Sequence, residues 1–307
     1  MKLGTRGSAL ALWQANWVKA ELEQRIAGLS VELVLIKTTG DKILDVPLAQ
    51  IGGKGLFTKE LDEALLNGSI DIAVHSLKDV PFQLPDGIDL AAVPEREDPR
   101  DAFLSNGPAL NELPDGATIG TSSLRRQVQL RHRFPALQLA MLRGNVDTRL
   151  RKLRERQFDG IILAAAGLNR LGYGSQITQT LDDDIMLSAV GQGALGIVCR
   201  CEDAAAHQHL SVLEHPPTRF AVTAERSLLK ALGGSCQVPV AGYAEVAGES
   251  LSLKGLIASL DGLRVLHARE SGSTADALAI GVRAGQKLME AGAAGILAEI
   301  AEHGPLG

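Results

Sequence analysis

The fold of this chain is decided by residues 71–81, which read Asp-Ile-Ala-Val-His-Ser-Leu-Lys-Asp-Val-Pro. We predict a buried strand over residues 70–74 that runs directly into a polar cluster and a proline. In open α/β sheets, the residues just beyond the carboxyl ends of the strands line the ligand crevice. Asp79, which lies beside the cation Lys78, is therefore a candidate catalytic carboxylate, and a solvated loop aspartate is the alternative.

The same alternation of apolar runs, polar turns and helical patterns extends over the first two thirds of the chain. It is typical of βα units and predicts an α/β fold with mixed, mostly parallel sheets. Further strands are expected at residues 2–5, 31–37, 118–120, 137–142, 160–165 and 195–199. Helices are expected at residues 8–24, capped by Ser8, and at residues 59–66 and 146–157.

Two polar segments that contain proline, residues 94–99 and 214–217, predict domain boundaries. A chain of 307 residues is long enough for two or three domains. Beyond the second boundary we expect a smaller α+β unit. Its strands are predicted at residues 240–246, 251–259 and 263–269, with a hairpin turn at 261–262, and its helix at residues 274–291.

The composition is that of an ordinary globular protein and excludes disordered and fibrous classes. Hydrophobic residues make up 45% of the chain and aromatic residues only 3%, so the core must pack mainly on aliphatic side chains. Because we find no signal-peptide pattern and no apolar run of membrane length, we expect a cytoplasmic protein. Cys199 and Cys201 are expected as reduced thiols packed on one face of a strand, and no cysteine or histidine spacing predicts a metal site.

The charge is unevenly distributed along the chain. The formal net charge is −5, which argues against nucleic acid as a partner. Residues 123–156, however, contain nine arginines and one lysine against two acids, a local charge of +8. A basic block inside an acidic protein favours a small polyanionic ligand over a polymer.

Three predicted strand-to-helix junctions carry arginine. In residues 120–126, Gly-Thr-Ser-Ser-Leu-Arg-Arg, free backbone N–H groups, hydroxyls and the helix dipole predict an anion site, and N-capping by Ser122 or Ser123 is the alternative. The same arrangement recurs at residues 141–146, with Arg149 one turn further on, and at residues 5–8. Their cations are expected to point toward one crevice, whereas Arg151, Arg154 and Arg156 are expected to face solvent.

Two further segments suggest function. Residues 41–55 are rich in glycine around Lys54, which suits either a mobile lid or a plain surface loop, but they lack the spacing of a P-loop. Residues 228–237 end a predicted helix at glycines and place Cys236 in an exposed turn. Because exposed thiols are unusual, Cys236 is a candidate nucleophile, attachment point or tolerated free thiol.

Together these segments resemble the porphobilinogen deaminase (hydroxymethylbilane synthase) family over essentially the whole chain. The resemblance is carried by residues 4–12, 52–57, 74–81, 120–126, 143–146, 166–172, 189–194 and 236–239. It implies two lobes like those of periplasmic binding proteins, formed by residues 1–95 with 194–213 and by residues 96–193, and a third domain over residues 214–307. It also implies a dipyrromethane cofactor joined to Cys236 by a thioether. The family commonly has Gly-Gly-Cys at this point, whereas Ser235 precedes the cysteine here, so a position that needs positive φ would be strained.

The implied activity is the joining of four porphobilinogen units into the linear tetrapyrrole hydroxymethylbilane, with release of ammonia, in haem biosynthesis. Loss of ammonia leaves a cation that a buried carboxylate, matched by Asp79, can stabilise. Each pyrrole brings two carboxylates, and a set of basic and hydroxyl residues is expected to bind them. The implied binding residues are Arg6, Ser8, Lys54, Ser76, Lys78, Thr121, Ser122, Ser123, Arg125, Arg126, Arg143, Gly144, Arg149, Arg170 and Gln192.

A monomer with no nucleic-acid or membrane partner is expected, and two rival functions are considered. A two-lobed binding protein for an anionic small molecule would share the fold class, but would need no Cys236 loop and would normally be exported. A cysteine-nucleophile hydrolase or transferase would need a histidine near Cys236, for which His215 and His267 are conceivable.

Overall fold

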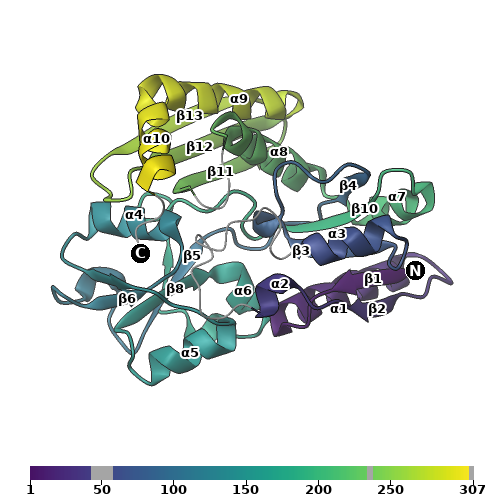
Figure 1. Ribbon diagram of the computed structural model, residues 1–307, viewed down its shortest axis with the longest axis horizontal. Coiled ribbons are helices and arrows are strands. Elements are labelled where there is room, and N and C mark those ends of the chain that lie inside the picture. Colours follow the sequence, from purple (N-terminus) through teal and green to yellow (C-terminus); the bar gives the residue numbers. More distant parts are fainter. Residues whose placement is uncertain (43–57, 234–237, 304–307) are drawn as a thin grey trace. The chain divides into compact units, whose positions relative to one another are not determined.

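The computed structural model describes residues 1–42, 58–233 and 238–303 of the chain (Figure 1). These residues form two compact units. Unit 1 comprises residues 1–42, 58–97 and 193–219, and unit 2 comprises residues 98–192 and 220–303 without the gap at 234–237. Lys54, Ser235 and Cys236 lie outside the described residues.

Unit 1 is built on a five-stranded mixed sheet. Its strand order is β2 (Glu32–Leu35), β1 (Lys2–Thr5), β3 (Ile72–Ser76), β10 (Leu195–Arg200) and β4 (Ile88–Ala92). The first three strands are parallel, and β10 is antiparallel to both of its neighbours. The predicted continuous apolar strand is buried on both faces, as expected for a strand inside such a sheet.

Helices cover both faces of this sheet. The side chains of β3 alternate between the two faces, which explains which helix each of them contacts. Ile72 and Val74 belong to the same cluster as residues of α1 (Ala9–Arg25) and α7 (Ala204–Leu210). Ala73, which points the other way, packs with α3 (Lys59–Leu66). The short helix α2 (Thr39–Lys42) also belongs to unit 1.

The first sheet of unit 2 repeats this strand arrangement. Its order is β7 (Gln138–Ala140), β6 (Thr118–Gly120), β8 (Gly160–Ala164), β5 (Asp101–Ser105) and β9 (Gln179–Leu181). Again the first three strands are parallel and the fourth is antiparallel to both neighbours. One face packs against α5 (Val146–Arg154) and α6 (Ala165–Arg170), and the other against α4 (Leu124–Arg133).

The second sheet of unit 2 is an antiparallel meander of β11 (Val240–Ala247), β12 (Ser250–Ala258) and β13 (Val265–Ser273). One face packs on α8 (Pro216–Ala231), α9 (Ala277–Leu288) and α10 (Ala294–His303) (Figure 1). Helices α8 and α9 approach so closely at Gly281 that a Cβ there would lie 2.2 Å from the Ala224 carbonyl oxygen. The other face of the meander packs with Val128 of α4 and Leu187, which joins the two sheets of unit 2.

The predicted α/β class with mixed sheets and a smaller α+β portion is confirmed, but three strands were not predicted. They are β4, β5 and β9. The predicted hairpin turn is confirmed, with Gly262 at φ +76°. The last predicted helix, at residues 274–291, is confirmed as α9 with the helical turns on either side of it, and Gly292 at φ +107° separates it from α10, which was not predicted.

The two cysteines of residues 199–201 differ in their surroundings. Cys199 is fully buried on β10, as predicted, and burial raises the pKa of its thiol to about 12. The prediction for Cys201 is wrong, because β10 ends at Arg200 and the next residue is exposed in a turn. Both thiols are free. Among the described residues, no helix has the length and apolar character needed to cross a membrane.

Candidate active site

In unit 1, the candidate residues lie at one edge of the sheet. Strands β1 and β3 are parallel neighbours, with Leu3 opposite Ile72, so their carboxyl ends meet at the same edge. Arg6 and Ser8 follow β1, and Lys78 and Asp79 follow β3. The segments that follow β1 and β3 therefore start at the same edge of this sheet.

The polar groups at this edge are fixed by local hydrogen bonds. The Ser8 hydroxyl caps α1 by accepting a 3.3 Å hydrogen bond from the Ala11 backbone N–H, as predicted. The amide Nε2 of Gln14, on the second turn of α1, donates a 2.8 Å hydrogen bond to the Ser76 hydroxyl. Helix α1 is thus joined to the end of β3 at the point where the candidate residues begin.

Asp79 occupies a short 3-10 turn over residues 77–79 that continues β3. The Leu77 side chain is buried and anchors this turn, and the Val80 backbone N–H donates to the Leu77 carbonyl. Lys78 is half-buried, and the Asp79 carboxylate is exposed. The expectation of a buried carboxylate is therefore wrong, because the buried residue of this turn is Leu77 and not Asp79.

His75, which sequence analysis left without a role, is a buried neighbour of this edge. It is 6% exposed, and its Nε2 has no hydrogen-bond partner among the residues that the structure describes. Burial, together with the positive charge of Arg6, lowers the pKa of His75 to about 4. At neutral pH the imidazole is thus uncharged and adds no positive charge beside Arg6.

In unit 2, three parallel strands bring further candidates to one sheet edge. Gly120 of β6 lies opposite Ala140 of β7 and Ile161 of β8, so the segments that follow these strands start side by side. The Thr121 backbone N–H donates to the Ala140 carbonyl, and the Ser122 hydroxyl donates a 2.7 Å hydrogen bond to the Leu142 carbonyl. Ser123 holds the N-cap position of α4, but its hydroxyl makes no capping hydrogen bond. Side-chain capping by either serine is therefore not what the structure shows.

The segment after β7 presents Arg143 at this edge. Its Nε is buried and has no hydrogen-bond partner in the described part of the chain. The next residue, Gly144, has φ +108°, and a Cβ there would lie 2.6 Å from Thr148 Cγ2, so only glycine fits. Arg149 Nε donates to the Gly144 carbonyl at 2.8 Å, which ties the first turn of α5 to this segment. Arg151, Arg154 and Arg156 are exposed, as predicted.

Arg125 and Arg126, in the first turn of α4, are buried at 5% and 6% exposure and bind the fully buried carboxylate of Asp101. Arg125 Nη1 lies 2.7 Å from Asp101 Oδ2, and Arg126 Nη2 lies 2.7 Å from Asp101 Oδ1. The two guanidinium groups outweigh burial and hold the pKa of Asp101 well below its usual range. Sequence analysis missed Asp101, because it begins the unpredicted strand β5.

The remaining two candidates differ in position. Gln192 is fully buried, and its Nε2 donates to the Pro99 carbonyl at 2.8 Å and to Asp101 Oδ1 at 3.0 Å. It therefore belongs to the Asp101 network. Arg170 is the half-buried last residue of α6, which follows β8 directly.

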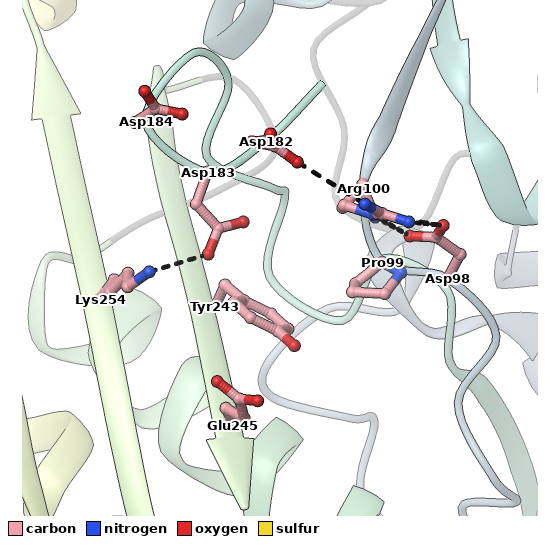
Figure 2. A pocket seen from close by; sticks show the side chains of 9 residues that line it. All are labelled: Asp98, Pro99, Arg100, Asp182, Asp183, Asp184, Tyr243, Glu245 and Lys254. Atoms are coloured by element: carbon pink, nitrogen blue, oxygen red, sulfur yellow. Dashed lines mark hydrogen bonds and ion pairs between the residues drawn. The ribbon is translucent and has the colours of Figure 1, made fainter. Parts of the chain in front are cut away.

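A separate cavity of about 600 Å³ lies in unit 2 and contains none of the candidate residues (Figure 2). Its lining is Asp98, Pro99, Arg100, Asp182, Asp183, Asp184, Tyr243, Glu245 and Lys254. Arg100 pairs with Asp98 and Asp182, and Lys254 pairs with Asp183. With five acids against two bases, this cavity is unsuited to a polycarboxylate ligand. Among the described residues, no cluster of histidine, cysteine and acidic side chains is arranged to hold a metal ion.

Comparison with known proteins decides the family. Residues 1–208 match the family described as porphobilinogen deaminase, dipyromethane cofactor binding domain, and residues 219–290 match porphobilinogen deaminase, C-terminal domain. The chain belongs to the porphobilinogen deaminase family. It is 55% identical to the porphobilinogen deaminases of Trichlorobacter lovleyi and Geobacter sulfurreducens over 98% of its length, covering 96% and 94% of those chains.

Among solved structures, the chain has a distant likeness to a TRAP periplasmic solute binding protein from Desulfovibrio salexigens. The sequence identity is 13% and the TM-score 0.42, with 70% of this chain and 72% of that chain covered. The matches to the porphobilinogen deaminase family, over residues 1–208 and 219–290, agree with the resemblance stated above.

Proposed function

We propose that this protein joins four porphobilinogen units into hydroxymethylbilane and releases ammonia, as a step of tetrapyrrole biosynthesis. The observation that carries the proposal is the 55% identity to curated porphobilinogen deaminases over 98% of the chain. The arrangement of both sheets is compatible with it, because each carries candidate residues at the carboxyl ends of its parallel strands.

The family uses a dipyrromethane cofactor, and the residues present fit such a group. Its carboxylates need cationic donors, and the buried Nε of Arg143 is a donor that has no partner within the described chain. When bound, dipyrromethane supplies the pyrrole to which a further unit is joined. We assign Arg143, Arg149, Arg170 and the Arg125–Arg126 pair to holding the carboxylates of cofactor and growing chain.

We assign Asp79 the role of stabilising the positive charge that develops as porphobilinogen loses ammonia. A carboxylate at the end of a fixed strand meets this need without rearrangement, because Leu77 anchors its turn. Its exposure means that the ligand itself must displace water from it. Arg6, Ser8, Ser76 and Lys78 are assigned to orienting substrate around Asp79.

Four further features belong to the proposal. Cys236 is the attachment residue, and Lys54 is a binding residue, although both lie outside the described part of the chain. The division into three domains, at residues 1–95 with 194–213, 96–193 and 214–307, also belongs to it. We place the enzyme in the cytoplasm as a monomer without nucleic-acid or membrane partners, and the two free thiols suit a reducing compartment.

The mass of the intact protein tests this function. We expect it to exceed the sequence mass by one dipyrromethane, and the denatured protein to react with acid Ehrlich reagent. Cys236→Ser should remove the increment, whereas Cys201→Ser, which removes a thiol that is exposed in the structure, should keep it. A fully active protein at the unmodified sequence mass would refute the proposal.

A further inference from the structure

The cluster of Asp101, Arg125 and Arg126 contains one more positive charge than negative charge. All three side chains are at most 8% exposed. In the described part of the chain, Asp101 is the only carboxylate that forms an ion pair with either guanidinium group. The cluster therefore has a net charge of +1 in a setting where an uncompensated charge is costly.

The remaining contacts of the cluster are neutral. Arg125 Nη1 donates to the Leu187 carbonyl at 2.6 Å, and Arg126 Nη1 donates to the Ile162 carbonyl at 2.9 Å. Gln192 Nε2 donates to Asp101 Oδ1 at 3.0 Å. These hydrogen bonds fix the orientation of the groups, but they leave the excess charge unchanged.

The hydrogen bonds of Arg125 also leave part of its guanidinium group available. Only Nη1 is used, for both Asp101 and Leu187, whereas Arg126 donates through Nε, Nη1 and Nη2. Within the described residues, Nε and Nη2 of Arg125 donate no hydrogen bond, and the residue as a whole is 5% exposed. The excess charge thus has unused donors on Arg125.

We infer that Asp101 is a positioning residue that sets the charge of an anion receptor. Its carboxylate cancels one of the two guanidinium charges, so that the Arg125–Arg126 pair accepts a single ligand carboxylate through Arg125. Without an internal carboxylate, the two guanidinium groups would have a net charge of +2. With a second internal carboxylate, the net charge of the cluster would be zero. The inference rests on the proposed function, since the ligand carboxylate is that of the dipyrromethane cofactor or of a substrate unit.

A pair of compensating substitutions tests this assignment. Arg126→Met leaves Asp101 paired with Arg125 at zero net charge, so the cofactor-loaded fraction measured by intact mass should fall about tenfold or more, as for the loss of one charge-assisted hydrogen bond. Adding Asp101→Asn to Arg126→Met restores the charge of +1, and we expect the loaded fraction to rise severalfold above that of Arg126→Met alone.

The matched control combines Arg126→Met with Asp183→Asn, which removes a carboxylate of unit 2 that pairs with Lys254 at the surface. This variant should load no better than Arg126→Met. Asp101→Asn alone should lower the thermal unfolding midpoint by on the order of 10 °C, because two charges are then left buried without a partner. The double variant should recover most of that loss. Circular dichroism of every variant separates poor loading from poor folding.

A double variant that loads no better than Arg126→Met, while folding as well, would overturn the inference, and so would normal loading of Arg126→Met. If Arg126→Met does not fold, Arg125→Met takes its place, since it leaves the same net charge on the cluster. Adding Asp101→Asn to Arg125→Met is not expected to increase the loaded fraction, because the unused donors of Arg125 are lost in both variants. Failure of the proposed function has a different result, since the wild-type protein would then have no dipyrromethane mass at all.

Discussion

Glu225 accepts a 2.7 Å hydrogen bond at Oε2 from the backbone N–H of Gly191. Its other oxygen, Oε1, accepts a 2.8 Å hydrogen bond from the Ala244 backbone N–H. Glu225 lies on α8 and is fully buried. One side chain therefore joins this helix to β11 and to the segment that carries Gln192, which in turn contacts Asp101.

We expect Glu225→Gln to lower the free energy of unfolding by about 1–3 kcal/mol, the cost of leaving a buried donor unsatisfied. The substituted amide keeps one acceptor but directs an N–H group at one of the two backbone donors. Urea denaturation would measure the change. Glu249→Gln, at an exposed position in the turn after β11, is the control and should alter stability by less than about 0.5 kcal/mol. Equal stability of both variants would contradict this account of Glu225.

Asp62 predicts an unusual pH dependence of stability. Burial raises the pKa of this α3 carboxyl to about 6, above its ordinary value of 3.8. A raised carboxyl pKa means that the folded state binds the proton more tightly than the unfolded state does. The contribution of protonated Asp62 to the free energy of unfolding is therefore complete below pH 3.8 and is lost as the pH rises through about 6.

Asp62→Asn should therefore be more stable than wild type at pH 8, by at most about 3 kcal/mol, and similar to wild type at pH 4. Thermal unfolding across this pH range measures the difference. Asp89→Asn, an exposed position in unit 1, should give no such pH-dependent gain. A gain that is the same at pH 4 and pH 8 would show that ionisation of Asp62 is not its cause.

Asp79 should matter much more in the transition state than in ground-state binding. Asp79→Asn keeps the size but removes the charge, so kcat should fall by ~10²–10³ with folding unchanged. Asp79→Glu keeps the charge but moves it, so partial activity should survive. Steady-state kinetics, with cofactor content checked by mass, gives the order wild type, Glu, Asn. The exposed Asp86→Asn serves as the control, and near-normal turnover of Asp79→Asn would remove Asp79 from the mechanism.

Arg143→Leu should impair chain growth, because it removes a buried guanidinium donor that has no partner within residues 1–42, 58–233 and 238–303. We expect the variant either to lack cofactor or to accumulate an early enzyme-bound intermediate, as resolved by mass after mixing with porphobilinogen. Arg151→Leu, on the exposed face of α5, removes an equal charge and should behave as wild type. Normal turnover of Arg143→Leu would exclude this residue from the binding site.

The sequence was sufficient to predict most of the strands, but not β4, β5 and β9. Strands β1 and β6 were predicted at their observed bounds, and β3 and β10 within two residues. Strand β9 has three residues with two polar ones, and β5 starts with an aspartate directly after a charged segment, so neither gives a clear periodicity. Strand β5 is fixed by its pairing with β8, and β9 by its pairing with β5, and a local sequence pattern cannot report such pairing.

The positions of candidate site residues were predictable where those residues directly follow a predicted strand. Residues at the ends of β1, β3, β6 and β7 were correctly placed at sheet edges because parallel neighbours end at the same side. The pairing of Arg125 and Arg126 with Asp101 was not predictable, since these residues are 24 and 25 positions apart and meet only through the strand order. For the same reason, the burial of Gln192 could not be read from residues 189–194.

The position of β10 determines the order in which the nascent chain can complete its sheets. This strand lies between β3 and β4, yet it is synthesised only at residues 195–200. The five strands of the first sheet of unit 2 span residues 101–181 without interruption. On the ribosome, the first sheet of unit 2 can therefore form before the sheet of unit 1 is complete, which reverses the usual N-terminal-first order of domain folding. Until β10 emerges, the unpaired edges of β3 and β4 are the part of the chain most in need of a chaperone.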